Sequence, residues 1–470
     1  MNSAHLLLVL CCIGLPALRA HHAAAPPTGG QASEGDVFAI LRTIDQADTR
    51  QAWPGFRLSD WPLAVFDGKQ TFLLRHPSPP VEFTPLVGRP GVFVAAGRYP
   101  AVVGNSTVYI GGVRTATVIA TPGPAPDSTL LAYVEEVFHV FWLRRHTNFR
   151  PNEMARYAYP VKDDRNLRRV LGEDEALSRA LEAASARQAA AWVALALQLR
   201  HERNAWLTDD DRAFETGLEM MEGTANCVAR VVVGEKPGAT AARLRTERPA
   251  DQIRWRYYDS GAAVCLLLER LQPDWKDRID AEPDQTTVGL LEAAATRSGA
   301  RPAAFSAAEL SRFEVHAATA IAELSARQGR LREEIQGRAG PRIVVEIASG
   351  VEPLRVTRFD PINLLVLDAG EVAHPRYLTL SGADGVIEVT NPGYERGSFA
   401  GTVVLTRPAG RHPLGEGIRM ASIVGLRTAP TVERREGRLT LETEGVRITL
   451  RDAEVRTEGE TLRIVVSPRR

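Results

Sequence analysis

The spacing of apolar residues changes twice along this chain, and these two changes limit what it can fold into. Short β-rich segments with Gly, Pro or Asn between them run from Trp61 to Thr121, and helical spacing follows from about residue 130 to 335. After Gly340 strand-like segments return. This order predicts an α+β fold: a small β-sheet, then a helical bundle, then an all-β domain. The sequence shows no repeat at the periods of solenoid proteins.

The same spacing gives the expected elements. Strands of the first sheet are expected at residues 62–66, 71–74, 91–95, 106–110 and 114–120. Helices are expected at residues 36–49, 130–146, 165–184, 187–206, 209–233, 254–271, 287–297 and 307–335. C-terminal strands are expected at residues 342–348, 364–367, 377–380, 386–390, 401–406, 418–426 and 438–466. A chain of 470 residues is too long for one ordinary core, so we expect domains at residues 36–335 and 342–470, with the boundary near 336–342.

The N-terminal segment has the pattern of a processing signal. Residues 6–20 are apolar apart from Arg19 and end in small residues, a length that suits secretion and is too short for a membrane span. We therefore expect a signal peptide at residues 1–20, a disordered leader at residues 21–35, and a secreted or periplasmic protein with no transmembrane segment after cleavage. Cleavage would leave Cys227 and Cys265 as the two remaining cysteines. The sequence allows either a disulfide between them or two buried free thiols.

The charge balance and the missing motifs exclude several classes of function. Lys plus Arg and Asp plus Glu both number 57, so we expect no binding to nucleic acid. The sequence contains no G-x-S-x-G, no G-x-x-x-x-G-K-[ST] and no G-x-G-x-x-G. Serine hydrolases with a nucleophile elbow, P-loop enzymes and dinucleotide enzymes are therefore disfavoured.

Two helical segments carry the candidate site. In the first, Glu135 and His139 are four residues apart and share a face of an apolar helix, with Glu136 beside Glu135. The zinc-peptidase motif H-E-x-x-H has this geometry, and here the pattern is E-E-x-x-H. In the second, Glu215, Glu219 and Glu222 follow one another at spacings of four and three, so they form one stripe. Carboxylates this close need a cation or a shared proton if they are buried.

These features resemble the zincin-type metallopeptidases, and the gluzincins in particular. Glu222-Gly223-Thr224-Ala225 matches the E-G-x-A signature of gluzincin aminopeptidases, in which the Glu is the third zinc ligand and the Gly lets its helix approach the first. The chain is also similar to secreted bacterial peptidase-like proteins with an H-E-x-x-H-x-F-Q helix, an Asn-Glu like Asn152-Glu153 and a Tyr-Pro like Tyr159-Pro160. In this chain Glu135 replaces the first His of the motif.

The resemblance implies a role for each ligand candidate. Glu135, His139 and Glu222 would hold zinc or another divalent metal. Two carboxylates beside one imidazole favour Mn²⁺ or another oxygen-preferring ion over zinc. Glu136 would be the general base that takes a proton from a metal-bound water. Glu219 and Glu215 would contact the ligand residues without binding the metal, or would serve as alternative ligands.

Three further expectations concern the surroundings of the metal. Tyr257 or Tyr258 would stabilise an oxyanion, or both are packing aromatics. Glu153 is either a ligand or the cap of a helix after Pro151. In zincin-like folds the strand before the active-site helix lies at the cleft edge and pairs with the substrate, which here corresponds to residues 114–120.

The function expected from this resemblance is hydrolysis of peptide bonds in a peptide or protein substrate by an exported metallopeptidase. One alternative is a catalytically inactive, peptidase-derived protein that binds a peptide or surface partner through the same cleft. Another is a structural exported protein whose helical bundle only resembles a zincin. The distance between His139 and Glu222 separates the last alternative from the first two.

Overall fold

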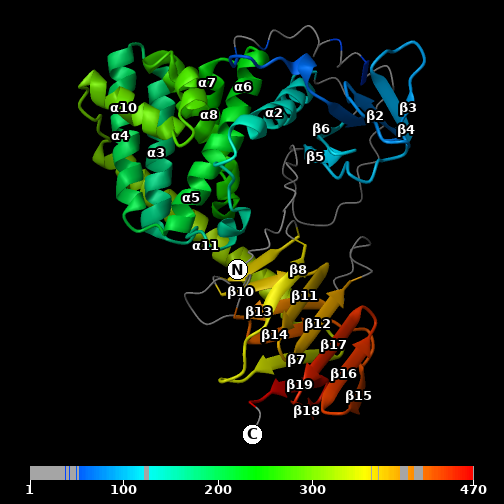
Figure 1. Ribbon diagram of the computed structural model, residues 1–470. Coiled ribbons are helices and arrows are strands. Elements are labelled where there is room, and N and C mark those ends of the chain that lie inside the picture. Colours follow the sequence, from blue (N-terminus) through cyan, green and yellow to red (C-terminus); the bar gives the residue numbers. More distant parts are fainter. Residues whose placement is uncertain are drawn as a thin grey trace. The chain divides into compact units, whose positions relative to one another are not determined.

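The computed structural model describes residues 37–38, 42, 49, 52–120, 126–360, 363–368, 370–391, 401–406 and 417–468. The expected signal peptide and leader lie outside these residues, as does most of the helix expected at residues 36–49. The fold is α+β, with helices in the middle of the chain and a β-rich C-terminal part (Figure 1). The chain divides into two compact units, one of Met1–Glu153 with Val161–Ala317 and one of Met154–Pro160 with Ala318–Arg470.

A six-stranded sheet of order β3-β4-β2-β1-β6-β5 opens the first unit. Its strands are β1 (Leu63–Phe66), β2 (Gln70–Leu74), β3 (Thr84–Pro85), β4 (Val92–Ala96), β5 (Ser106–Ile110) and β6 (Val113–Ile119). Strand β6 pairs with β1 in parallel and with β5 in antiparallel orientation. The expectation that residues 114–120 lie at the edge of the cleft is therefore wrong. The chain turns tightly at Gly111–Gly112, and β5 pairs along the outer edge of β6.

Helices form the rest of the first unit. They are α2 (Pro126–Arg145), α3 (Asp164–Glu182), α4 (Ala186–Asn204), α5 (Asp209–Leu218), α6 (Thr224–Val232), α7 (Pro237–Leu244), α8 (Ile253–Leu271), α9 (Trp275–Ala281), α10 (Thr287–Ser298) and the first part of α11 (Ala307–Gln336). Short helical turns of this unit lie at η1 (Leu58–Asp60), η3 (Glu219–Gly223) and η4 (Ala250–Gln252), while η2 (Glu153–Tyr157) begins in this unit and continues in the second one. The helix expected at residues 209–233 is thus α5, η3 and α6 in succession.

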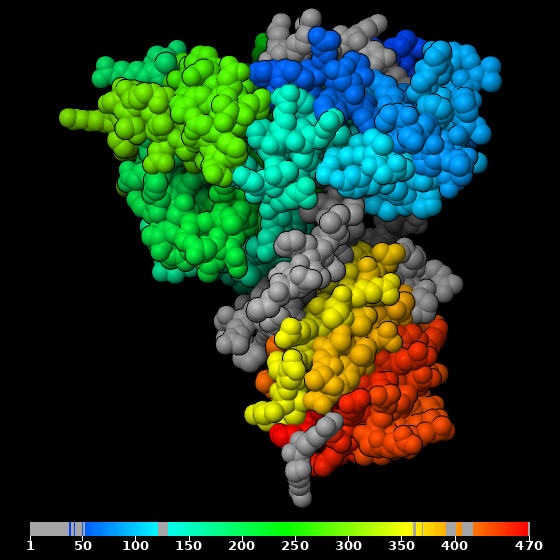
Figure 2. All heavy atoms as spheres, in the orientation of Figure 1, coloured from blue at the N-terminus to red at the C-terminus, as the bar shows by residue number. Residues whose placement is uncertain are grey.

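Helix α2 is the central element of this unit. It packs against β6 and β5 on one side and against α6 on the other, and Figure 1 shows it between the sheet and the other helices. On the surface in Figure 2 the cyan atoms of this part of the chain likewise lie between the green helices and the blue sheet. Because both sides of α2 are covered, its aromatic residues Phe138, Phe141 and Trp142 are buried in one cluster with Trp53. The polar side chains of Glu136 and His139 on this part of α2 are therefore buried among apolar residues.

The second unit is a sandwich of two sheets. The orders are β18-β19-β7-β14-β13-β10-β9 and β15-β16-β17-β12-β11-β8, and apolar residues of both sheets share one buried cluster. The strands are β7 (Arg342–Ile347), β8 (Arg355–Phe359), β9 (Leu365–Asp368), β10 (Glu371–His374), β11 (Tyr377–Gly382), β12 (Gly385–Thr390), β13 (Thr402–Thr406), β14 (Met420–Val424), β15 (Thr431–Arg435), β16 (Arg438–Thr443), β17 (Val446–Arg451), β18 (Ala453–Glu458) and β19 (Thr461–Val466).

The end of α11 belongs to this second unit. Ile335 packs with Leu367, Ala373 and Val404 in a separate buried cluster, which the partly buried Leu331 completes. The expected boundary near residues 336–342 lies between the end of α11 and the start of β7, whereas the two compact units divide inside α11, after Ala317. The last turns of α11 therefore belong to the second unit, because their apolar residues are buried against its strands.

Candidate metal centre

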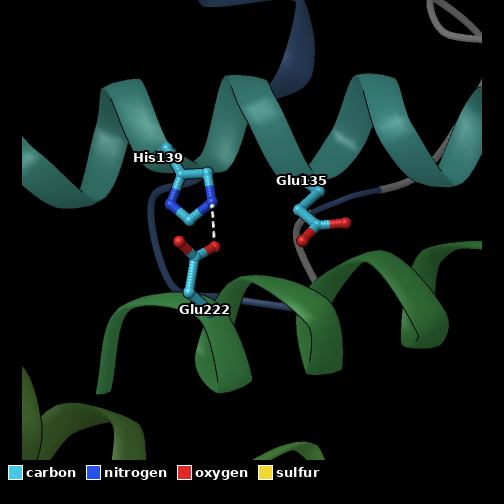
Figure 3. Close-up of side chains that lie close together, drawn as sticks. All are labelled: Glu135, His139 and Glu222. Carbon is cyan, nitrogen blue, oxygen red and sulfur yellow. Dashed lines mark ion pairs between the residues drawn. The ribbon is translucent and has the colours of Figure 1, made fainter. Parts of the chain in front are cut away.

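Helix α2 presents the first part of the candidate centre. Glu135 and His139 are one turn apart, and in Figure 3 both point from α2 toward Glu222 on the facing helical segment. His139 and Glu136 are each only 3% exposed, while Glu135 keeps partial exposure to solvent. The apolar residues around them hold α2 against its neighbours, so these polar groups are buried as a consequence of the packing of the helix.

The second part comes from the turn between α5 and α6. Thr208 caps the start of α5 through a capping box with Asp211, and the helix then widens into the π-helical turn η3, which contains Glu222. Such turns insert an extra residue and are frequent at functional sites. The widening changes the direction in which residues after Leu218 project, and spacing in the sequence could not have revealed it.

A close crossing of two helices fixes the position of this turn. A Cβ atom added to Gly223 would lie 2.5 Å from the Cα atom of Gly261 on α8, and one added to Gly261 would lie 2.6 Å from the Cα atom of Gly223. Only glycine at both positions allows this contact between backbones. The crossing brings the first two turns of α8 next to Glu222.

The three predicted ligands converge. Glu135, His139 and Glu222 each offer one ligand atom, and these atoms all lie within 4.8 Å of one another. His139 Nε2 is 3.1 Å from Glu222 Oε2, yet within the described residues neither ring nitrogen of His139 has a well-directed hydrogen bond. His139 and Glu222 thus face each other, and Glu135 lies near enough for all three to share one cation. In the described part of the chain this is the group of His, Cys, Asp and Glu residues that could hold a metal ion.

Burial dominates the electrostatics of this group. Burial raises the pKa of Glu135 to about 7, although His139 opposes the shift. Burial, together with Glu135 and Glu222, also raises the pKa of Glu136 well above its usual range. Burial raises the pKa of Glu222 as well, but His139 and Arg254 outweigh it and hold this pKa at about 2. The group thus has fewer positive charges than carboxyl groups, and a divalent cation would relieve that imbalance.

The donor set fits a divalent ion. Carboxylate oxygen and imidazole nitrogen are both ligands of zinc and of harder ions such as Mn²⁺. Bonds of about 2.0–2.2 Å place neighbouring ligand atoms roughly 3–4.5 Å apart, so the observed separations need little adjustment. Glu136 Oε2 is buried and has no hydrogen-bond partner in the described residues. Burial of an unpaired carboxyl oxygen is costly, so this group sits in an environment that does not satisfy it.

The structure does not bring Glu215 and Glu219 into the ligand group. Arg200 donates hydrogen bonds to both carboxylate oxygens of Glu219, at 2.6 and 2.7 Å, and Ser260 Oγ donates another at 2.6 Å. Arg203 forms an ion pair with Glu215. These pairings do not support the expectation of alternative ligands, because each carboxylate is already neutralised. They lie instead in a buried network that also contains Glu173.

The two tyrosines have different surroundings. Tyr257 is fully buried and packs edge-on against Phe214, so it is a packing aromatic. Tyr258 forms a hydrogen bond with Glu222 that helps to lower the pKa of that carboxylate, and its hydroxyl also accepts a hydrogen bond from Arg254 at 2.6 Å. Tyr258 therefore contacts the candidate centre through Glu222.

Sequence reasoning missed Arg254 and left the role of Glu153 open. Arg254 donates a hydrogen bond to Glu222 Oε1 at 3.1 Å and binds both oxygens of Glu153. Arg254 is one turn before Tyr258 on α8, so a search for a cation on the same helix face would have found it. Glu153 begins η2 and is not one of the three converging ligands.

Cys227 and Cys265 are free and buried. Each lies one turn after a glycine of the Gly223–Gly261 crossing, and the neighbouring thiol adds to the effect of burial in raising the pKa of Cys265. Of the two arrangements left open by the sequence, the structure therefore has two buried thiols.

Searches of protein-family models, curated proteins and solved structures found no match to this chain. The resemblance to gluzincins stays a prediction from the sequence motifs. Among the helices that the structure describes, none combines the length and the apolar character needed to cross a membrane.

Proposed function

We propose that this protein is an exported, zincin-like, metal-dependent hydrolase of peptide bonds, with its centre at Glu135, His139 and Glu222. The observation that carries the proposal is the convergence of these three side chains, from two segments far apart in the sequence, within 4.8 Å. A divalent ion held there would polarise a peptide carbonyl and make water more acidic. Zinc and Mn²⁺ are the ions to test first, since two of the three ligands are carboxylates.

Glu136 is the proposed general base. It follows Glu135 on α2, it is buried, and its Oε2 has no hydrogen-bond partner in the described residues. Burial raises its pKa, and a nearby cation would lower that pKa back toward neutrality, where a carboxylate is an effective base. Its role is to take a proton from the attacking water and to pass that proton to the leaving amine.

Replacing Glu136 by Gln tests this role. The amide keeps the size of the side chain but cannot accept the proton, so we expect Glu136→Gln to keep the bound metal and to lose hydrolysis by about 100-fold or more. The measurement is cleavage of a quenched-fluorescence peptide library by the zinc- and Mn²⁺-loaded protein, with metal content by elemental analysis. Glu323→Gln, at an exposed position of α11, is the matched control and keeps full activity. Unchanged hydrolysis in Glu136→Gln would rule out the mechanism.

A second candidate function is a peptidase-derived protein that binds a peptide or surface partner without catalysis. One observation favours it: Arg254 already brings a fixed positive charge to Glu222, which partly meets the need for a cation. If the purified protein binds neither zinc nor Mn²⁺ at micromolar concentration, this second candidate replaces the first.

A further inference from the structure

The two oxygens of Glu222 have different partners. Oε2 is 3.1 Å from His139 Nε2, on the side of the ligand group. Oε1 accepts a hydrogen bond of 3.1 Å from Arg254 Nη2. Glu222 is 0% exposed and Arg254 is 7% exposed, so water competes little with either contact. Arg254 therefore holds the carboxylate through Oε1, while Oε2 faces His139 in the ligand group.

Arg254 is itself held in place on several sides. Its Nε donates to both oxygens of Glu153 at 2.9 and 3.0 Å, and its Nη1 donates to the hydroxyl of Tyr258 at 2.6 Å. The guanidinium also lies over the rings of Trp255 and Tyr258, at 5.0 and 5.1 Å from their centroids. A planar guanidinium fixed in this way can direct a carboxylate more strictly than the flexible ammonium of Lys could.

The charges of these groups also bear on metal binding. Glu153 is 8% exposed and forms a buried ion pair with Arg254, so its negative charge offsets that of the guanidinium. Without Glu153, the positive charge of Arg254 would be offset less. It would then repel a cation bound at Oε2 of Glu222 more strongly. With Glu153 present, Glu222 keeps its negative charge for the ligand group while its orientation stays fixed.

We propose that Arg254 is a positioning residue that makes Glu222 a one-oxygen metal ligand, and that Glu153 keeps Arg254 from competing with the metal. This inference rests on the proposed function, because it concerns the same centre. It adds two residues outside the ligand set, both contributed by elements other than α2 and η3. Partners that orient metal ligands typically change metal affinity by about 10–100-fold when they are removed.

The test compares Arg254→Gln, Arg254→Lys and Glu153→Gln with the wild-type protein. Each is titrated with Co²⁺ and Mn²⁺, and affinity is measured together with the visible absorption spectrum of the bound Co²⁺. We expect Arg254→Gln to weaken Co²⁺ binding by about 10–100-fold and to alter the spectrum, because Glu222 can then bind through both oxygens. Arg254→Lys restores the charge but not the fixed direction, so it regains affinity only in part. Arg187→Gln, at an exposed position of α4, is the control and leaves both readouts unchanged.

The outcomes separate this inference from the proposed function. If the wild-type protein binds no metal, both fail. If the wild-type protein binds metal and folded Arg254→Gln has the same affinity and spectrum, only the positioning role fails. Should Arg254→Gln not fold, Glu153→Gln decides: weaker metal binding supports the proposal, and unchanged binding overturns it.

Discussion

At the scale of single residues, the candidate centre depends on where each charge is buried. Glu222 is ionised because His139 and Arg254 face it, whereas Glu135 and Glu136 have raised pKa values because burial is not offset to the same extent. Three carboxyl groups close together in the fold therefore differ in the charge they carry, with Glu222 ionised and the pKa values of Glu135 and Glu136 raised. The difference comes from the neighbours, which the sequence does not place.

His374 shows the same effect in the second unit. It lies in β10, is 2% exposed, and has no hydrogen-bond partner for either ring nitrogen among the described residues. Burial lowers its pKa to about 3, although Asp360 acts in the opposite direction. An unfolded His has a pKa of about 6.5, so the unfolded chain binds the proton more tightly than the folded one.

This difference predicts a loss of stability in acid. The stabilisation due to neutral His374 is complete above pH 6.5 and falls as the pH drops from 6.5 toward 3. Between pH 7.5 and pH 5 we expect His374 to account for a loss of about 2 kcal/mol. In His374→Leu this share of the pH dependence disappears. The measurement is urea unfolding of both proteins at several pH values, followed by pulse proteolysis with C-terminal peptides identified by mass spectrometry. It gives the slope of the free energy of unfolding against pH for each protein. Equal slopes in the two proteins would contradict the assignment.

At the scale of elements, the crossing at Gly223 and Gly261 has the largest consequences. It brings α8 against η3, and this contact places Arg254 and Tyr258 beside Glu222. It also brings Cys227 and Cys265 together one turn later. A side chain at Gly223 has no space, since the nearest atoms belong to the backbone of α8.

We therefore expect Gly223→Ala to destabilise the first unit by about 1–3 kcal/mol or more and to weaken metal binding. Gly238→Ala in α7 is the matched control, because no heavy atom lies within 4 Å of its added Cβ. That change should instead stabilise the helix by about 0.5–1 kcal/mol. Urea unfolding monitored by tryptophan fluorescence measures both variants. If Gly223→Ala is as stable as the wild-type protein, the close crossing is not required.

The order of strands is also decided at this scale. The sequence indicated the strand that became β6, but not that β5 would cover its outer side. Strand periodicity identifies which residues face each side of a sheet and carries no information on which strand lies at the edge.

At the scale of the whole molecule, each compact unit has its own buried core. All seven tryptophans precede Lys276, so tryptophan fluorescence reports on the first unit alone. The candidate metal ligands belong to the same unit. A ligand of the native state stabilises the part of the protein that holds it.

We therefore expect the metal to raise the stability of the first unit selectively. At a free concentration of 100 times the dissociation constant, the gain is about 2.7 kcal/mol. Tryptophan fluorescence should show this shift in urea unfolding, while proteolysis of C-terminal peptides should show none. Chelation should reverse the shift, and the same gain in both units would contradict a site confined to the first.

Much of the fold and part of the site were predictable. Apolar periodicity gave the α+β class and the positions of most long helices and strands, because it records which side of each element is buried. It missed short elements such as α7, β3 and β8, whose few residues carry too little periodicity, and it joined α5 to α6 because a π turn leaves helical spacing nearly intact.

By itself the sequence determined the candidate ligands, since residues four apart on one helix must share a face, and Glu135 and His139 are such a pair. The motif resemblance had indicated Glu222 among the three carboxylates of the stripe, and the tertiary structure places Glu222, not Glu215 or Glu219, near them. Arg200 and Arg203 neutralise Glu219 and Glu215, whereas Glu222 faces His139. Spacing within one helix determines on which face each side chain lies. Whether a buried carboxylate stays ionised depends on charged partners from other elements, which only tertiary packing brings close.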